Sequence, residues 1–225
     1  MNLTYYPFEP FKIVPNKVNI LDVGNSKMYF DICRGFSDSA DTIKISNDDL
    51  EIQDCGKQCS WYGDLMFSVD LNKLFMRKIQ QRLMALMTDE QQVALLDRGR
   101  EVISGVTDIS FLMDLPLEVS SLPDIEKIMK FVGLSFPAEL TGNPYAILET
   151  LIQTHVELGI KKQLVLTNIS HYISKKQFSD LSQLVSDLNV TIINIEFSEI
   201  NRVEKFVDAH YYYVDEDFMD WRSKG

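Results

Sequence analysis

Two short apolar stretches, Leu164–Ile169 (LVLTNI) and Val190–Phe197 (VTIINIEF), decide the fold. Both are nearly continuous and rich in Val and Ile, whereas a strand with one solvent-exposed face would alternate apolar and polar residues. They therefore predict strands that are buried on both faces, as in a parallel sheet. The segment between them predicts a helix that has a capping box at Ser174 and Gln177 and ends at Asn189. A strand, a helix and a strand in this order predict a right-handed crossover at the core of an α/β domain.

Signals of the same kind surround this unit. Asn143 and Pro144 predict the start of a further helix, which ends at Gly159. Nearer the amino end, Val18–Val23 (VNILDV) predicts another buried strand, and Asn25 lies near the expected cap of the helix that follows it. The α/β pattern therefore occupies both ends of the chain.

Between these two α/β portions the spacing of apolar residues becomes helical. Asp70 predicts the cap of one helix, and Thr88 with Gln91 forms a second capping box. Ser121 predicts the start of a third helix. This block is therefore expected to be an insertion that is mostly α-helical.

The predicted fold is α/β: a head domain with a mainly parallel sheet that carries an inserted helical leg. The head is expected to comprise residues 1–64 and 142–225, and the leg residues 65–141. Within the head, Val203–Val207 predicts a short helix, and Tyr211–Val214 predicts the last strand before an acidic tail.

The composition limits the possible functions. Hydrophobic residues make up 45% of the chain, and no apolar run approaches the ~20 residues that a membrane span needs. Three cysteines, an odd number in a chain of this size, are typical of a reducing cytoplasm. The net charge of −11 argues against a uniformly basic nucleic-acid binder. Binding to DNA would require lysines gathered on one surface.

Three short motifs are weak candidates for chemistry. Gly24–Lys27 (GNSK) lies where a phosphate-binding loop would lie, but the pattern G-x-x-x-x-G-K-[ST] is missing, so a structural turn is expected. Asn168–His171 (NISH) follows a central strand, but it lacks the glycines of a nucleophile elbow and predicts a solvated loop. Cys55 and Cys59 form a single pair, whereas a zinc site normally needs four convergent ligands.

Four acidic residues near the third leg helix are the candidate metal ligands: Asp114, Glu118, Asp124 and Glu126. Carboxylates around a loop and a helix start are suited to Ca²⁺, which takes six to eight oxygen ligands. The alternative is that acids in a first helical turn only complement the helix dipole, and spacing alone favours this alternative.

Four lysines are the candidates for contact with nucleic acid. Lys127 and Lys130 share one face of the third leg helix, and Lys161 and Lys162 precede the central strand. From spacing alone, such pairs are usually solvated charges at the edge of a domain.

A family resemblance adds to this interpretation. Residues 160–199 (IKKQLVLTNISHYISKKQFSDLSQLVSDLNVTIINIEFSE) and 208–218 (DAHYYYVDEDF) resemble the Csn-two family of type II-A CRISPR loci. In that family a doubled lysine leads into an apolar strand that ends in Val/Thr–Asn. The next strand ends in Glu, and a tyrosine-bearing strand runs into Asp-Glu-Asp. The leg segments 115–119 (LPLEV) and 124–136 (DIEKIMKFVGLSF) agree in pattern.

The resemblance implies a fold and a function. It implies a head similar in topology to P-loop NTPases, without their nucleotide motif, and a helical leg. It implies a homotetrameric ring, supported by calcium ions, whose basic lumen encircles double-stranded DNA and is entered at free ends. It also implies a non-catalytic role in spacer acquisition, alongside the CRISPR integrase proteins and the type II effector nuclease. An acidic exterior with a basic lumen would reconcile DNA binding with the net charge.

The resemblance also implies roles for single acidic residues. Glu118, with Asp114, matches acidic positions of the family just ahead of the third leg helix. Ser120 and Ser121 stand where family members often have Asp or Glu. This departure reduces the number of oxygen ligands that are expected for calcium.

Among the lysines, Lys130, Lys161 and Lys162 match lysines of the family in type and place. The expected function is therefore sequence-independent binding of double-stranded DNA ends by a cytoplasmic homotetramer. Two other functions stay open. One is a divalent-metal nuclease that uses the four acids, and the other is an oligomeric interaction scaffold that does not bind DNA.

Overall fold

The chain forms two compact units in the computed structural model, which describes residues 1–68, 70–119 and 124–222. One unit comprises Met1–Val69 with Ala138–Gly225, and the other comprises Asp70–Pro137. The first unit is the α/β part of the chain and the second is helical.

The first unit alternates strands with helices. Its strands are β1 (Asn2–Thr4), β2 (Phe11–Lys12), β3 (Val18–Val23), β4 (Lys44–Ser46), β5 (Ile52–Gln53), β6 (Cys59–Gly63), β7 (Gln163–Thr167), β8 (Ile192–Phe197), β9 (His210–Val214) and β10 (Asp220–Arg222). Its helices are α1 (Ser26–Ser37), α2 (Cys55–Gln58), α3 (Leu65–Ser68), α7 (Pro144–Glu157) and α8 (Lys175–Asp187), with single 3-10 turns η1 (Ala138–Gly142), η2 (Ile169–His171) and η3 (Val203–Lys205).

The larger sheet has the order β10-β9-β3-β8-β7-β6 among the described strands. From β9 to β6 neighbouring strands are parallel, and β10 pairs with β9 in the antiparallel sense. The two stretches that decide the fold form β7 and β8, which are neighbours joined by α8, as the crossover predicts. A smaller antiparallel sheet has the order β2-β1-β4-β5. The predicted fold class, a mainly parallel α/β head with a helical insertion, is confirmed.

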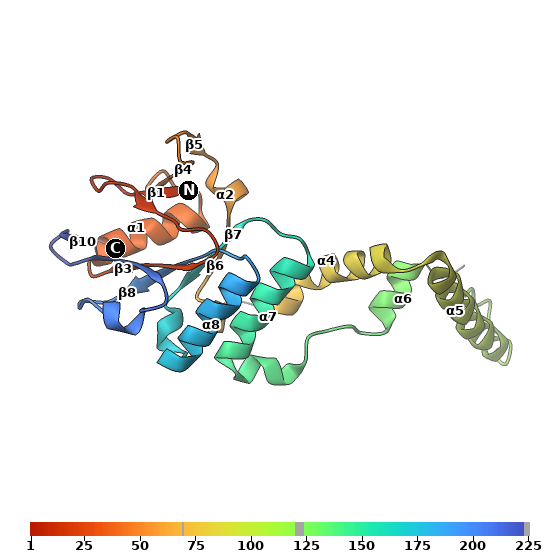
Figure 1. The fold of residues 1–225 in the computed structure, drawn as a ribbon. Coiled ribbons are helices and arrows are strands. Elements are labelled where there is room, and N and C mark those ends of the chain that lie inside the picture. The colour runs from red at the N-terminus through yellow and green to blue at the C-terminus, as the bar shows by residue number, and fades with distance from the viewer. Residues whose placement is uncertain (69, 120–123, 223–225) are drawn as a thin grey trace. The chain divides into compact units, whose positions relative to one another are not determined.

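Helices lie on both faces of the larger sheet (Figure 1). On one face α1 packs against β3, β6 and β8, and its residue Ile32 belongs to the same buried cluster as Val23 and Ile195. On the other face α7 and α8 lie side by side. Successive side chains of a strand point to opposite faces. Asp22 and Glu196, each next to one of these two strand residues, therefore point to the face that α8 covers.

The helix caps form as the local sequence predicts. Ser174 and Gln177 make a reciprocal capping box at the start of α8. The side chain of Asn143 caps α7 and is followed by proline at the first helical position. A cap needs only residues that are close in sequence, which is why these signals can be read without the fold.

The second unit consists, in its described part, of α4 (Leu71–Leu86), α5 (Asp89–Ser110) and α6 (Ile125–Phe131). Asp70 caps α4 by accepting hydrogen bonds from the backbone N–H groups of Asn72 and Lys73, and α5 begins with the predicted capping box. Asp124 caps α6, whereas the predicted helix start at Ser121 lies outside the described residues. None of the described helices has the length and apolar character that crossing a membrane requires.

Three local predictions were wrong or incomplete. Val203–Val207 forms only the single turn η3. The loop Asn168–His171 is not solvated throughout, because Ile169 and Ser170 are buried. The acidic tail does not simply follow the last strand. The side chain of Asp215 accepts hydrogen bonds that fold the tail back, so that β10 can pair with β9.

Candidate nucleic-acid interface and a buried acid–arginine cluster

A buried cluster of charged residues lies at the carboxyl ends of β3 and β8. Asp22 and Glu196 are register partners on these neighbouring strands, and neither side chain is exposed. Arg202 follows β8 and reaches between them. Its Nη2 donates to Oδ1 of Asp22 at 2.9 Å and to Oε2 of Glu196 at 3.1 Å, and its Nε donates to Oδ2 of Asp22 at 3.0 Å. Because α/β proteins tend to place sites at this end of the sheet, the cluster is the first candidate.

Ser170 and Asn194 complete the hydrogen bonding of Glu196. Ser170 donates to this carboxylate from its backbone N–H at 2.9 Å and from its Oγ at 2.7 Å. Asn194 donates from Nδ2 at 2.7 Å. A second cation is close, since Nζ of Lys205 donates to the backbone carbonyl of Ser170 at 2.6 Å.

The carboxylate of Asp22 is satisfied in the same way. The hydroxyl of Tyr211 donates to its Oδ2 at 2.9 Å. Burial raises the pKa of Asp22, and the hydrogen bonds and the charge of Arg202 oppose that rise. Buried charges that are paired and hydrogen-bonded like these hold neighbouring strands and loops in register. The cluster is therefore a structural ion-pair network, and it exposes neither carboxylate to a substrate.

Hydrogen bonds within the chain hold the turn at Gly24–Lys27 in place. The backbone N–H of Gly24 donates to the carbonyl of Val214 at 2.7 Å. A Cβ atom at position 24 would lie 3.0 Å from the backbone nitrogen of Glu216, so a larger residue here would require the tail at Glu216 to shift by a few tenths of an ångström. Asn25 then caps α1 by accepting from the N–H of Met28 at 3.0 Å.

The four predicted metal ligands lie in the second unit: Asp114, Glu118, Asp124 and Glu126. All four are exposed. Among the described residues, no three His, Cys, Asp or Glu side chains come together in a way that could hold a metal ion. Asp124 instead caps α6, and Ser120 and Ser121 lie outside the described residues. The described residues of a single chain therefore do not fit a calcium ion, nor the metal centre of a nuclease.

The two lysines of α6 that are predicted to contact DNA each pair with an acidic residue at the amino end of that helix. Nζ of Lys127 lies 3.6 Å from a carboxylate oxygen of Asp124, and Nζ of Lys130 donates to Glu126 at 2.7 Å. All four side chains are well exposed. Exposed pairs of this kind contribute about 0–1 kcal/mol, so they do not prevent the lysines from contacting a phosphate.

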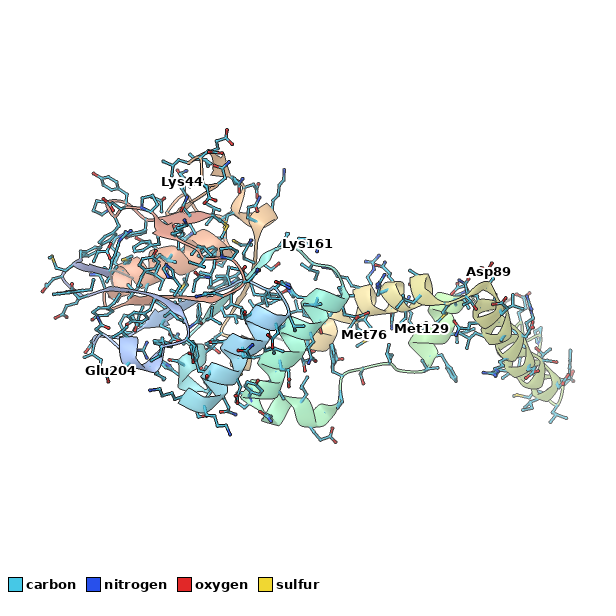
Figure 2. The ribbon with its side chains drawn as sticks, viewed as in Figure 1. Lys44, Met76, Asp89, Met129, Lys161 and Glu204 are labelled. Carbon is cyan, nitrogen blue, oxygen red and sulfur yellow. The ribbon has the colours of Figure 1, made fainter. Side chains whose placement is uncertain are left out.

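Lys161 and Lys162 lie in the connection between α7 and β7 of the first unit. Figure 2 labels Lys161. Both lysines are exposed, and Nζ of Lys162 donates to the backbone carbonyl of Gly56 at 2.5 Å. With Asn189 and Thr191 they border a hollow of about 340 Å³ at the amino ends of β7 and β8. These two lysines therefore belong to a different compact unit from the lysine pair of α6.

The helix α4 carries a basic segment that was not predicted from the sequence. This helix of 16 residues carries Lys73, Arg77, Lys78 and Arg82, all exposed, and no acid. Within the described part of the chain, Lys73 is the one of these four cations that pairs with a carboxylate, and its Nζ lies 3.7 Å from the capping Asp70. The signal was available, because no Asp or Glu occurs between Asp70 and Asp89 in a chain whose net charge is −11.

Comparison with known proteins places the chain in a family. The family described as CRISPR-associated protein (Cas_Csn2) matches residues 38–218. The crystal structure of Stu0660 of Streptococcus thermophilus is similar, with a TM-score of 0.58 and 12% sequence identity, over 99% of this chain and 76% of that chain. At this identity the similarity shows the fold alone. No protein with a curated description matches the sequence. Because the family match covers most of the length, the chain belongs to the Cas_Csn2 family of CRISPR-associated proteins, as the resemblance predicted.

Proposed function

We propose that this chain is a non-catalytic protein that binds the ends of double-stranded DNA without regard to sequence and acts in CRISPR spacer acquisition. Its association with CRISPR follows from the family. The proposal adds that four chains form a ring around the DNA, and that the ring works alongside the integrase proteins and the type II effector nuclease in the cytoplasm.

The observation that carries the proposal is the segregation of charge. The four cations of α4 have no acid beside them on the helix, although the chain as a whole has a net charge of −11. Lys161 and Lys162 add a second exposed pair. Contacts from lysine and arginine to phosphates position a protein on DNA and carry no sequence information. Such segregated cations are what a sequence-independent DNA binder of acidic composition requires.

Exposed apolar surface on the second unit supports assembly into an oligomer. None of the described residues of α5 is buried, although the helix is 22 residues long. Its apolar residues and those of α6 line a groove of about 320 Å³: Leu95, Val102, Ile103, Ile128, Phe131 and Val132. Large exposed apolar patches usually mark surfaces that another chain covers. We take this groove as part of the contact between chains.

We propose that calcium binds only where two chains meet in the assembled protein. The carboxylates of Asp114 and Glu118 are exposed, and within the described residues neither belongs to a group of three side chains that could hold a metal ion. A site with six to eight oxygen ligands would therefore need ligands from a neighbouring chain. Support of the ring by calcium is thus proposed as a property of the contact between chains.

The basic helix provides the test. The change is the triple variant Arg77→Ala, Lys78→Ala, Arg82→Ala, and the measurement is affinity for a linear duplex at several salt concentrations. In a plot of log affinity against log salt concentration, each lost phosphate contact should make the slope shallower by about 0.9. The slope for the triple variant should therefore be shallower than that of the wild type by up to about 2.7 for each chain that contacts the DNA. The matched control is Arg34→Ala with Lys44→Ala, because both residues are exposed cations that lie outside α4 and outside the two candidate lysine pairs.

Two results would overturn the proposal. One is a wild-type protein that does not shift linear DNA even at low salt, which would favour an interaction scaffold. The other is a triple variant whose affinity and salt slope equal those of the wild type, which would remove α4 from the interface.

A further inference from the structure

Cys55 is the first residue of α2, and Cys59, one helical turn later, is its C-cap and the first residue of β6. Asp54 caps this turn by accepting from the N–H of Lys57 at 2.9 Å, and the N–H of Cys59 donates to the carbonyl of Cys55. Residues four apart in a helical turn have Cα atoms about 6 Å apart, given a rise of about 1.5 Å per residue. This separation falls within the range of about 4.4–6.8 Å that a disulfide bond spans.

The two thiols differ in exposure and in acidity. Cys59 is buried in the core cluster that also contains Ile45 of the smaller sheet and Val165 of the larger one, whereas Cys55 packs against that cluster and is partly exposed. A hydrogen bond between the two thiols lowers the pKa of Cys55 and raises the pKa of Cys59. A partly exposed thiol with a lowered pKa is suited to attack a disulfide and form a mixed disulfide. A second thiol beside it can then attack that mixed disulfide and form an intrachain disulfide bond.

The surroundings of the pair hold it in place. Nζ of Lys162 donates to the carbonyl of Gly56, which lies between the two cysteines, and ties α2 to the start of β7. The third cysteine has a different environment. Cys33 lies on α1, and burial raises its pKa to about 11. The chain therefore contains one thiol pair and one separate, less acidic thiol.

We propose that Cys55 and Cys59 are a dithiol modification site, which a small disulfide such as glutathione disulfide oxidises to an intrachain disulfide bond. In the first step the thiolate of Cys55 attacks one sulfur of the small disulfide and expels one small thiolate, leaving a mixed disulfide on Cys55. In the second step the thiol of Cys59 loses its proton, attacks the sulfur of Cys55 and expels the second small thiolate. Two protein thiols are oxidised, and one small disulfide is reduced to two thiols.

The test follows the mixed disulfide by intact mass and peptide mapping after incubation of the full-length protein with glutathione disulfide. The wild type should pass through a glutathione adduct on Cys55 and finish with an unadducted protein that has one thiol left, at Cys33. In Cys59→Ala the adduct should persist on Cys55, because no resolving thiol is present. Cys33→Ala is the matched control and should form the disulfide as the wild type does.

A second measurement separates a reactive site from a structural one. At neutral pH, iodoacetamide should modify Cys55 about tenfold faster than Cys33, because a thiol with the lower pKa has the larger thiolate fraction. Cys59→Ala should slow this reaction by removing the hydrogen-bond donor, and Cys59→Ser should restore part of it. If the Cys59 variants do not fold, Cys55→Ala provides the test instead. In that variant neither Cys33 nor Cys59 should form an adduct with glutathione disulfide. A persistent adduct on wild-type Cys55, or equal rates at Cys33 and Cys55, would overturn the proposal.

Discussion

Asp22 and Glu196 face each other across the neighbouring strands β3 and β8, both without solvent exposure, and one guanidinium joins them. Two buried carboxylates this close repel each other unless a cation lies between them. Arg202 supplies that cation from the loop after β8. Its hydrogen bonds therefore connect this loop to Asp22 on β3 and to Glu196 on β8.

Arg202→Ala should destabilise the protein by about 3–5 kcal/mol, because it leaves two buried charges without their partner. Without the charge and hydrogen bonds of Arg202, the pKa of the buried Asp22 carboxyl should rise further in the folded state. The loss of unfolding free energy should therefore be smaller at pH 5 than at pH 8. Urea unfolding at the two pH values measures this. The control is Arg34→Ala, whose exposed pair with Asp38 should change stability by at most about 1 kcal/mol. A loss for Arg202→Ala no greater than the control's would contradict the assignment.

If the apolar groove of the second unit forms the contact between chains, charged substitutions in the groove should dissociate the proposed tetramer. Val102 and Phe131 are 59% and 83% exposed in the single chain, so Val102→Glu with Phe131→Glu should leave its melting temperature nearly unchanged. The mass from light scattering should nevertheless fall. Val207→Glu, at an exposed position of the first unit, serves as the control. A wild-type mass of one chain at micromolar concentration would count against assembly.

Calcium should stabilise the assembled protein and not the dissociated one. If the ligands come from two chains, the free energy of unfolding should rise by about 2.7 kcal/mol at one hundred times the dissociation constant. The groove variant Val102→Glu with Phe131→Glu should show no such rise, and Glu118→Gln should weaken it in the wild type. Melting curves with millimolar Ca²⁺ and with chelator provide the comparison. Curves that coincide for the wild type would show that calcium has no role.

Stability should fall at alkaline pH. The pKa of Tyr29 is raised to about 12 by burial, and the pKa values of Tyr5 and Tyr172 are raised to about 12 as well. The folded state therefore keeps protons that the unfolded state loses above pH ~10. Stability should be fully present below pH ~10 and should decline as pH rises from 10 towards 12. Tyr29→Phe should decline less steeply, whereas Tyr6→Phe, at an exposed position, should match the wild type. Unfolding curves unchanged up to pH 12 would be inconsistent with these shifts.

The elements that could be predicted are those whose signals are local. The capping box of Ser174 and Gln177 and the run at Val190–Phe197 lie within a few residues, so the crossover unit was predicted correctly. β6 (Cys59–Gly63) was missed because CSWYG has neither a continuous apolar run nor an alternating one. It becomes a strand only because β7 offers it a parallel edge. Boundaries of such elements depend on tertiary contacts.

The buried cluster could not be predicted, because its members are far apart in the chain. Asp22 and Arg202 are separated by 180 residues. Ser170 was expected in a solvated loop, since nothing near it in sequence indicates that it donates to Glu196. The basic helix is different. Its basic character is visible in the sequence as the absence of Asp and Glu around Arg77 and Arg82, and not as a pair of neighbouring lysines.

Threading of a ring onto DNA ends is tested by comparing a linear duplex with a covalently closed relaxed circle of the same sequence. Binding of both is measured by gel shift at one low salt concentration. Threading predicts that the linear duplex binds, that the circle does not, and that bulky protein blocks on both ends abolish loading but trap a ring that is already loaded. Equal binding of circle and linear DNA would contradict threading, because the contact would then lie on an outer surface of a chain whose net charge is −11.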